Sequence, residues 1–374
     1  MRTYDLVVAG AGPAGAAAAI AARRAGADVL LLDRAGFPRD KPCGDGIAAE
    51  AVAVLESLGV TGVTDGYPAI DRLRLVGPDG AAVARQLPRP AHTVPRLVFD
   101  ERLVRAAVAA GAELRRHAVR RVSDRGDGVV IDDVARARVL IGADGAGSVV
   151  RRQLGHPVNP PGHLAVAIRG YAPTGNTSEQ VIVTTRQRWP AYAWEFPIGD
   201  GTANVGYGEV LRGEALTKAY LLERMRDLLA GAEPAGVRGH HLPLSTRRPR
   251  PGRGRVLLAG DALSLINPFT GEGIFYAVLS GSLAGAAAAA GPEGVAERYR
   301  DALRGRLGRH LRHSGFAAWL SRRPRVVDAA VDAAARDGDV FDRMVELGLG
   351  DGVFDLRTIG RISLRLGHRR PAHP

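Results

Sequence analysis

The stretch YDLVVAGAGPAG, residues 4–15, decides how the rest of the chain is interpreted. Its first half is mostly apolar and ends at a glycine, which is typical of a buried parallel strand. The alanine-rich residues 14–25 predict a helix packed tightly on that strand. In this spacing Gly10 permits the sharp turn, Gly12 lets a phosphate approach the backbone, and Gly15 lets the helix and strand pack closely. The stretch therefore predicts a dinucleotide-binding turn, with the positive end of the helix facing the phosphates.

A second apolar run, residues 28–32, ends at Asp33, 18 residues beyond Gly15. An acid at this distance is expected to accept a hydrogen bond from a ribose hydroxyl. Arg34 follows directly. In an NADP protein Arg34 would meet the 2'-phosphate, whereas in an FAD protein it would contact the adenine side or simply face solvent.

Two more strand-to-glycine junctions occur far along the chain. Residues 137–141 lead into the sequence GADG, 142–145, and residues 255–259 lead into Gly260-Asp261. An Asn-Pro pair and the sequence GEG, 271–273, come shortly after the second of these. Because one extended cofactor can touch all three junctions, we expect the chain to bind FAD. Only one GxGxxG is present, so a reduced nicotinamide, NAD(P)H, is expected to bind transiently, or another carrier supplies the electrons.

The acids at these later junctions also have expected roles, and that of Asp144 has two interpretations. Asp144 accepts a hydrogen bond from a ribose hydroxyl, or it caps the helix expected over 148–154. Asp261 is placed to hold a hydroxyl on the ribityl or pyrophosphate side. The helix beginning near Gly271 is expected to aim its amides at the flavin ring, where they would stabilise negative charge.

The chain has 374 residues, 46% of them hydrophobic and 24% charged, which indicates a globular protein with one large domain or two intimate ones. The net charge of +12 has three open explanations: a solvated arginine-rich surface, an anionic substrate such as a diphosphate, or an acidic membrane surface. The basic residues are dispersed and accompany no recognition motif, so nucleic acid is not an expected partner. The oligomeric state stays open.

Cys43 is the only cysteine, so an intrachain disulfide is excluded, which fits a reducing cytoplasm. The N-terminus enters the first strand at once and leaves no room for a signal peptide. No apolar run is long enough to cross a bilayer. We therefore expect a cytoplasmic protein whose contact with a membrane, if it has one, is peripheral.

The pattern of the remaining segments predicts an interrupted architecture. Residues 70–87 look like a hairpin, and residues 160–210 alternate in the manner of antiparallel strands. The expected fold class is α/β with an α+β insert: a Rossmann-like FAD-binding domain (1–67, 96–158 and 250–292), an antiparallel-sheet substrate domain (68–95 and 159–249), and a helical C-terminal region (293–374).

Four motifs carry a resemblance to a known family. They are KPCGDG at 41–46, RxxFDxxL at 96–103, YAWEFP at 192–197, and the third junction from Gly260 through NPxxGEGI, ending at Ile274. Together they resemble the geranylgeranyl reductase family within the p-hydroxybenzoate hydroxylase superfamily of FAD proteins. The resemblance covers nearly the whole chain. In those reductases the YxWxFP element lies on the substrate sheet and shapes the prenyl cavity.

The resemblance also implies roles for single residues. Cys43 would lie close to the flavin ring with a lowered pKa, and would donate a proton or contact substrate; the alternative is a small packing residue. Asp45 would order its loop, and Lys41 would pair with a phosphate or face solvent. Arg96 would lie near the flavin or its phosphates, or else form a surface ion pair.

The full set of predicted cofactor-binding residues combines the three junctions with these motifs: Gly10, Gly12, Pro13, Ala14, Gly15, Asp33, Arg34, Cys43, Gly44, Asp45, Gly46, Arg96, Asp144, Gly145, Gly260, Asp261, Pro268, Gly271, Glu272, Gly273 and Ile274.

Tyr192, Trp194 and Phe196 would share one face of a strand, because they are spaced by two. We expect them to line the substrate cavity, with Tyr192 and Trp194 joining Cys43 as catalytic candidates, although ordinary core packing is the alternative. Tyr207, Phe269 and Phe275 are weaker candidates for the cavity. No metal site is expected: the ten histidines lack ligand spacing, and adjacent histidines on a strand, as at 240–241, point apart.

The expected function is reduction of carbon–carbon double bonds in a prenyl chain or related polyene, with hydride from flavin N5 and a proton from Cys43, a tyrosine or water. The alternative is an FAD monooxygenase of an aromatic or polyketide substrate. A third hypothesis is a flavin-bound protein that has lost its redox chemistry and binds or cyclises a ligand.

Overall fold

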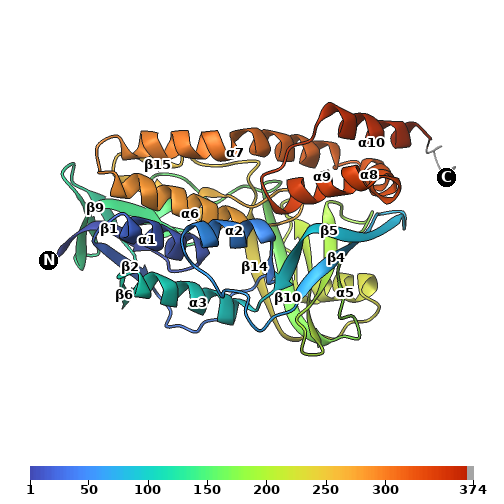
Figure 1. Ribbon diagram of the computed structural model, residues 1–374, viewed down its shortest axis with the longest axis horizontal. Helices are drawn as coiled ribbons and strands as arrows, with labels where there is room; N and C mark the ends of the chain where they lie inside the picture. The colour runs from blue at the N-terminus through green and yellow to red at the C-terminus, as the bar shows by residue number, and fades with distance from the viewer. Residues whose placement is uncertain (369–374) are drawn as a thin grey trace.

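The computed structural model describes residues 1–368 and contains two eight-stranded sheets joined side by side (Figure 1). The first sheet, at the N-terminal end of the molecule, is built around parallel strands. Its order is β15 (Gly252–Arg253), β16 (Val256–Leu258), β9 (Ala135–Gly142), β1 (Thr3–Ala9), β2 (Val29–Asp33) and β6 (Glu113–Arg116). In addition, β8 (Val129–Ile131) pairs antiparallel with β9, and β7 (Val122–Asp124) pairs antiparallel with β8.

The second sheet is antiparallel except where β4 meets β11 in parallel. Its order is β14 (Ala235–Pro243), β10 (Leu164–Pro173), β13 (Thr202–Val210), β12 (Ala191–Pro197), β11 (Glu179–Thr184), β4 (Ala69–Val76), β5 (Ala82–Thr93) and β3 (Gly46–Ile47).

The helices cover the sheets and fill the C-terminal part of the chain. They are α1 (Pro13–Arg24), α2 (Ala49–Ser57), α3 (Arg96–Ala109), α4 (Val149–Gln153), α5 (Lys218–Leu228), the short 3-10 helix η1 (Gly260–Leu263), α6 (Ile274–Ala289), α7 (Val295–Leu320), α8 (Pro324–Arg336), α9 (Gly338–Leu349) and α10 (Leu356–His368). Within residues 1–368, none of them is both long and apolar enough to cross a membrane.

The register of the first sheet brings the three glycine junctions together. Ala9 at the end of β1 pairs with Gly142 at the end of β9, and Gly142 in turn pairs with Leu258 at the end of β16. Parallel strands that end in register leave their following turns at one edge of the sheet. The predicted α/β fold with its Rossmann-like domain, second sheet and helical C-terminal region is confirmed.

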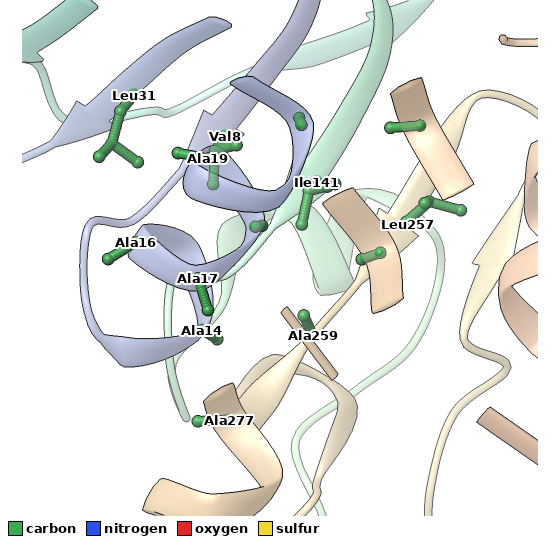
Figure 2. Close-up of a cluster of buried hydrophobic side chains, with 14 of the residues drawn as sticks. Val8, Ala14, Ala16, Ala17, Ala19, Leu31, Ile141, Leu257, Ala259 and Ala277 are labelled. Carbon is green, nitrogen blue, oxygen red and sulfur yellow. The ribbon is translucent and has the colours of Figure 1, made fainter. Parts of the chain in front are cut away.

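Small residues allow α1 to lie directly against α6, and Figure 2 shows alanines of both helices facing each other beside Val8 and Ile141. A Cβ on Gly281 would lie 2.0 Å from the carbonyl oxygen of Ala14, and one on Gly285 would lie 2.2 Å from that of Ala18. Neither position can accept a side chain unless a backbone moves.

The sequence patterns missed parts of the second sheet. Gly46 and Ile47, just before α2, pair with Thr93 and His92 as the short strand β3. The parallel pairing of β4 with β11 departs from the antiparallel sheet that was expected. These pairings join segments distant in sequence, so no local periodicity indicates them.

We expect Gly285→Ala to lower the free energy of unfolding by about 1–3 kcal/mol, since the new methyl group would overlap the α1 backbone. Gly305→Ala is the matched control, because Gly305 lies in α7 with open space at its Cβ position. It should raise stability by about 0.5–1 kcal/mol. Urea unfolding followed by circular dichroism measures both, and equal effects of the two substitutions would contradict the packing argument.

Candidate active site

One large cavity lies between the glycine edge of the first sheet and the face of the second. It holds about 1270 Å³ of empty space, including its opening. One wall comes from the loop 41–48 and the start of α6, and the opposite wall from β10, β11, β12 and β14. The predicted site residues that line it are Pro13, Cys43, Gly44, Gly46, Arg96, Tyr192, Trp194, Phe196, Asp261, Gly271, Glu272, Gly273 and Ile274.

The first glycine turn has the features that a dinucleotide pyrophosphate requires. Helix α1 starts at Gly12 with no side-chain cap and no acid in its first turn, so no carboxylate competes for its N-terminal amides. Asp33 braces the turn, since its Oδ2 accepts from the amide of Ala11 at 2.8 Å and its Oδ1 from that of Ala35 at 2.9 Å. Arg34 is exposed. These residues fit the phosphate end of FAD.

Sequence reasoning missed Arg39, which lies over this turn. A Cβ on Gly12 would lie 3.5 Å from Arg39 Nη2, and the same guanidinium contacts Asp100 at 3.0 Å. A cation this close to an open helix N-terminus would add to the attraction for a diphosphate. In the sequence, the only feature that could have indicated a role for Arg39 is its position just before the KPCGDG motif.

Asp144 serves as a helix cap in this structure. Its carboxylate accepts from the Ser148 hydroxyl and from the amide of Val149 at 2.6 Å, at the start of α4. Burial raises the pKa of Asp144 above its ordinary value, and these hydrogen bonds oppose that shift. Of the two interpretations left open by the sequence, the geometry favours capping.

At the third junction, Asp261 forms a charged cluster with two partners. Lys41 Nζ lies 3.0 Å from Asp261 Oδ2, and His240 Nε2 lies 3.9 Å from the same oxygen. Burial acts to raise the pKa of Asp261, but the charge of Lys41 and the His240 contact outweigh it, so the pKa is lowered. Lys41 therefore pairs with a protein carboxylate, which neither sequence interpretation included. Among residues 1–368 no group of acids, histidines and Cys43 could hold a metal ion.

The expectation of a lowered Cys43 pKa is wrong. Burial raises the pKa of the thiol, and the nearby charge of Arg96 offsets this only in part. Arg96 is itself buried and donates twice to Asp100, over 2.6 and 2.8 Å, which neutralises much of its charge. The thiol therefore keeps its proton at neutral pH. Arg96 still lines the cavity, but as half of a buried ion pair rather than a surface one.

Asn204, which the sequence analysis missed, links the cysteine loop to the aromatic strand. Its Nδ2 donates to the Cys43 carbonyl oxygen and to Asp45 Oδ2, each over 2.8 Å, and its Oδ1 accepts from Trp194 Nε1 over 2.9 Å. The Tyr171 hydroxyl donates to the same Asp45 oxygen over 2.7 Å. Asp45, in a left-handed conformation with φ of 59°, therefore orders the loop. Burial raises the pKa of Asp45 to about 6 despite these bonds.

Tyr192, Trp194 and Phe196 of β12 all line the cavity, and a glycine on β13 makes room for the indole of Trp194. Tyr192 pairs with Gly208 and Trp194 with Gly206, where a Cβ would lie 2.1 Å from the indole. Aromatic rings commonly cover glycines across a strand pair in this way. The spacing of those two glycines matched that of the two aromatics and was a signal in the sequence.

The other aromatic predictions are wrong. Tyr207 pairs with Ala193, so it points to the opposite face, packs beneath α5 and donates to Glu209 over 2.8 Å. Phe275 is buried in the core of the first domain, and Phe269 does not line the cavity. Residues that pair across neighbouring strands point to the same face of the sheet. The face that Tyr207 occupies therefore depends on its pairing with Ala193, which the sequence does not reveal.

Glu272 lies at the start of α6, on the wall of the cavity. Its Oε1 accepts from the Phe275 amide over 2.7 Å, so one of the amides expected to face the flavin already has a partner. Burial raises the pKa of Glu272 to about 7, in opposition to that hydrogen bond. This carboxyl group can therefore gain or lose a proton near neutral pH.

The C-terminal helices close part of the cavity. Asn267 Nδ2 donates to the Leu347 carbonyl oxygen over 2.9 Å, and the Thr270 hydroxyl donates to that of Gly348 over 2.6 Å. These bonds tie the end of α9 to the loop that follows the third junction. Leu349, the last residue of α9, lines the cavity, although the sequence analysis named no residue of this region.

Comparisons with known proteins agree with this site. Residues 3–184 match the FAD binding domain family. Over 98% of each chain, the protein is 34% identical to menaquinone reductase from Mycolicibacterium smegmatis. It is 36% identical to digeranylgeranylglycerophospholipid reductase 1 from Methanopyrus kandleri, covering 75% of this chain and 79% of that one. The crystal structure of a geranylgeranyl bacteriochlorophyll reductase-like protein from Thermoplasma acidophilum has the same fold, with a TM-score of 0.81, 20% identity, and coverage of 99% and 97%.

The fold and the site thus define an FAD-dependent oxidoreductase. More narrowly, the chain belongs to the geranylgeranyl reductase family of these enzymes.

We expect Asp45 to make stability depend on pH. Its pKa in the folded protein, about 6, lies above its ordinary value of 3.8, so its stabilising contribution is complete at low pH and is lost as pH rises through about 6. The loss amounts to about 2 kcal/mol between pH 4 and pH 7. In Asp45→Asn, which also tolerates the left-handed backbone, this part of the decline should vanish.

Urea unfolding at several pH values measures the effect. Asp133→Asn is the control, because Asp133 shares the left-handed conformation, with φ of 58°, but is exposed. Wild type and Asp45→Asn showing the same pH profile would disprove the role given to Asp45.

Proposed function

We propose that this enzyme hydrogenates carbon–carbon double bonds in the polyprenyl chain of a lipid. The observation that carries the proposal is the cavity itself, which is shared between the FAD-binding turns and a wall of apolar side chains. A cavity of this kind suits a hydrocarbon chain that must lie beside a flavin.

The two sides of the cavity differ in polarity. The side next to the third junction holds Lys41, His240 and Asp261. Across the cavity, Leu73 of β4, Ile182 of β11 and Leu349 of α9 form an apolar surface continuous with the core beneath α8 and α9. An apolar wall gains free energy by covering hydrocarbon, roughly 25 cal/mol per Å² of buried surface. It offers nothing to a polar substrate.

The relatives point to the same substrate class. One is named for menaquinone and another for a digeranylgeranyl lipid, and both molecules carry a polar head on a chain of isoprene units. The two lipids share isoprene units and differ in their polar heads, which fits an enzyme family that acts on the isoprenoid part.

Reduction of an alkene adds a hydride to one carbon and a proton to the other. FAD, once bound and reduced, supplies the hydride. The protein supplies two protonated groups. One is the Cys43 thiol, whose pKa is raised by burial. The other is the Tyr192 hydroxyl, whose pKa is raised by burial and by the charge of Glu272. The Tyr192 hydroxyl donates to the Thr270 carbonyl oxygen, which fixes the ring beside the cavity.

The protein's other contribution is to exclude water and align the chain. Trp194 is held by Asn204 and is almost fully buried, so the aromatic wall has little freedom to move. The single dinucleotide turn leaves NAD(P)H, or another reductant, as a transient electron donor at the same cavity.

Anaerobic incubation of the dithionite-reduced enzyme with geranylgeranyl diphosphate, or with detergent-dispersed menaquinone, should reoxidise the flavin. After air oxidation has returned any quinol to the quinone, mass spectrometry should find products that are heavier by two hydrogens for each reduced alkene. Unchanged substrate with both lipids would overturn the proposal. A product that gains oxygen only in aerobic turnover with NADPH would indicate a monooxygenase instead.

We expect Cys43→Ala to slow substrate-dependent flavin reoxidation by about a hundredfold while FAD binding is retained, because the substitution removes a buried protonated group. Cys43→Ser, which restores a hydroxyl of similar size, should recover part of the rate. Stopped-flow absorbance of the flavin measures the rates, and titration with FAD checks binding. If both variants react within a few-fold of wild type, Cys43 is only a packing residue.

A further inference from the structure

Two large aromatic side chains are exposed near the end of α7. Phe316 is 49% exposed and Trp319 is 54% exposed, and their rings stack with centroids 5.8 Å apart. Single exposed apolar residues are ordinary, but a stacked aromatic pair is costly to leave in water. Figure 1 shows α7 running along one long edge of the molecule, away from the cofactor turns.

Arginines extend this aromatic pair into a stripe. The spacing of three and four residues places Arg309, Arg312, Phe316 and Trp319 on one face of α7. Arg322, Arg323 and Arg325 follow directly beyond the helix, and all five arginines are exposed. Within residues 1–368 none of the five forms an ion pair, whereas Arg304 and Arg306 of the same helix pair with Asp301 and Asp351. We call these seven residues the α7 stripe.

The other side of α7 is firmly attached to the protein. His310, Ser314 and Ala317 are buried there. Just beyond the helix, the Trp189 indole donates to the carbonyl oxygen of Ser321. Trp189 lies between β11 and β12, two strands that line the cavity. The α7 stripe is therefore a fixed surface close to the substrate wall.

We propose that the α7 stripe docks the enzyme on an anionic lipid bilayer. Phe316 and Trp319 would enter the interface between head groups and acyl chains, and the arginines would contact lipid phosphates. A net charge of +12 favours the same partner. A second copy of the chain fits poorly, because a twofold contact would press arginines against arginines.

The purpose of this docking rests on the proposed function. A polyprenyl lipid leaves a bilayer at great cost in exposed hydrocarbon, so an enzyme that meets its substrate at the bilayer surface avoids much of that cost. The docking itself depends only on the α7 stripe and is tested separately.

The test uses the full-length, FAD-loaded protein and vesicles of phosphatidylcholine with or without phosphatidylglycerol. We expect the protein to float with the phosphatidylglycerol vesicles, to bind less as salt rises, and to show a shift of tryptophan emission to shorter wavelength. Trp319→Phe should keep the binding and lose the shift, since Trp189 and Trp194 are already partly or fully buried.

Substitutions in the stripe set the size of the effect. Arg312→Gln should weaken partitioning about fivefold, and Phe316→Ser about tenfold. The matched controls are Arg125→Gln and Val108→Ser, which alter exposed residues outside the stripe and should bind as wild type does. All of these variants should reduce a detergent-dispersed substrate at the wild-type rate, so loss of docking is distinguished from loss of the proposed activity.

Several results would overturn the proposal. They are no binding by the wild type, equal binding to vesicles without phosphatidylglycerol, and equal binding by Arg312→Gln and Phe316→Ser. A sedimenting dimer in which Trp319 becomes buried, or a stripe that binds single-stranded nucleic acid in preference to vesicles, would likewise assign the surface to another partner.

Discussion

The alignment of three parallel strand ends is the constraint on which the rest of the structure depends. Because β1, β9 and β16 stop in register, turns that lie more than 100 residues apart in the chain meet at one edge of one sheet. The backbone hydrogen bonds of that sheet are satisfied independently of any ligand. The nucleotide site is therefore a product of strand pairing, and the side chains only refine it.

The chemistry of the cavity follows from how buried charge is compensated. Arg96 and Asp261 are both neutralised by protein partners, Asp100 for the first and Lys41 for the second. Asp45 and Glu272 lack a comparable cation, and burial raises the pKa of each toward neutrality. The cavity wall thus contains one carboxylate that stays ionised, Asp261, and one carboxyl group that can carry a proton, Glu272, and Asp45 beside it resembles the second.

The sequence predicted the parts of this site that are set locally. Gly10 has a positive φ at the turn, and Gly15 packs against the carbonyl oxygen of Gly10, so both are set by residues a few positions away. The face shared by Tyr192 and Trp194 follows from the strand period alone. Asn204 could not be assigned, because its partners Cys43 and Asp45 lie more than 150 residues away. His240 could not be assigned either, because it meets Asp261 only where β14 of the second sheet lies beside the third junction of the first. Cys43 was misjudged because burial, the largest cause of its raised pKa, depends on how its loop packs against distant segments. The pairing of Arg96 with Asp100, four residues later on the same helix, was a signal in the sequence.

The contribution of α9 has a consequence for how such enzymes diverge. Leu349 belongs to the substrate wall, yet it is held there by Asn267 and Thr270, which grip the backbone of residues 347 and 348 and no side chain of the helix. Gly348 itself must stay small, because a Cβ there would lie 2.7 Å from Thr270 Cγ2, but these two hydrogen bonds place no demand on the other side chains of α9. Substitutions in α9 can therefore change the shape of the substrate cavity without changing the FAD-binding turns. Related enzymes can acquire new substrates through changes in their C-terminal helices alone.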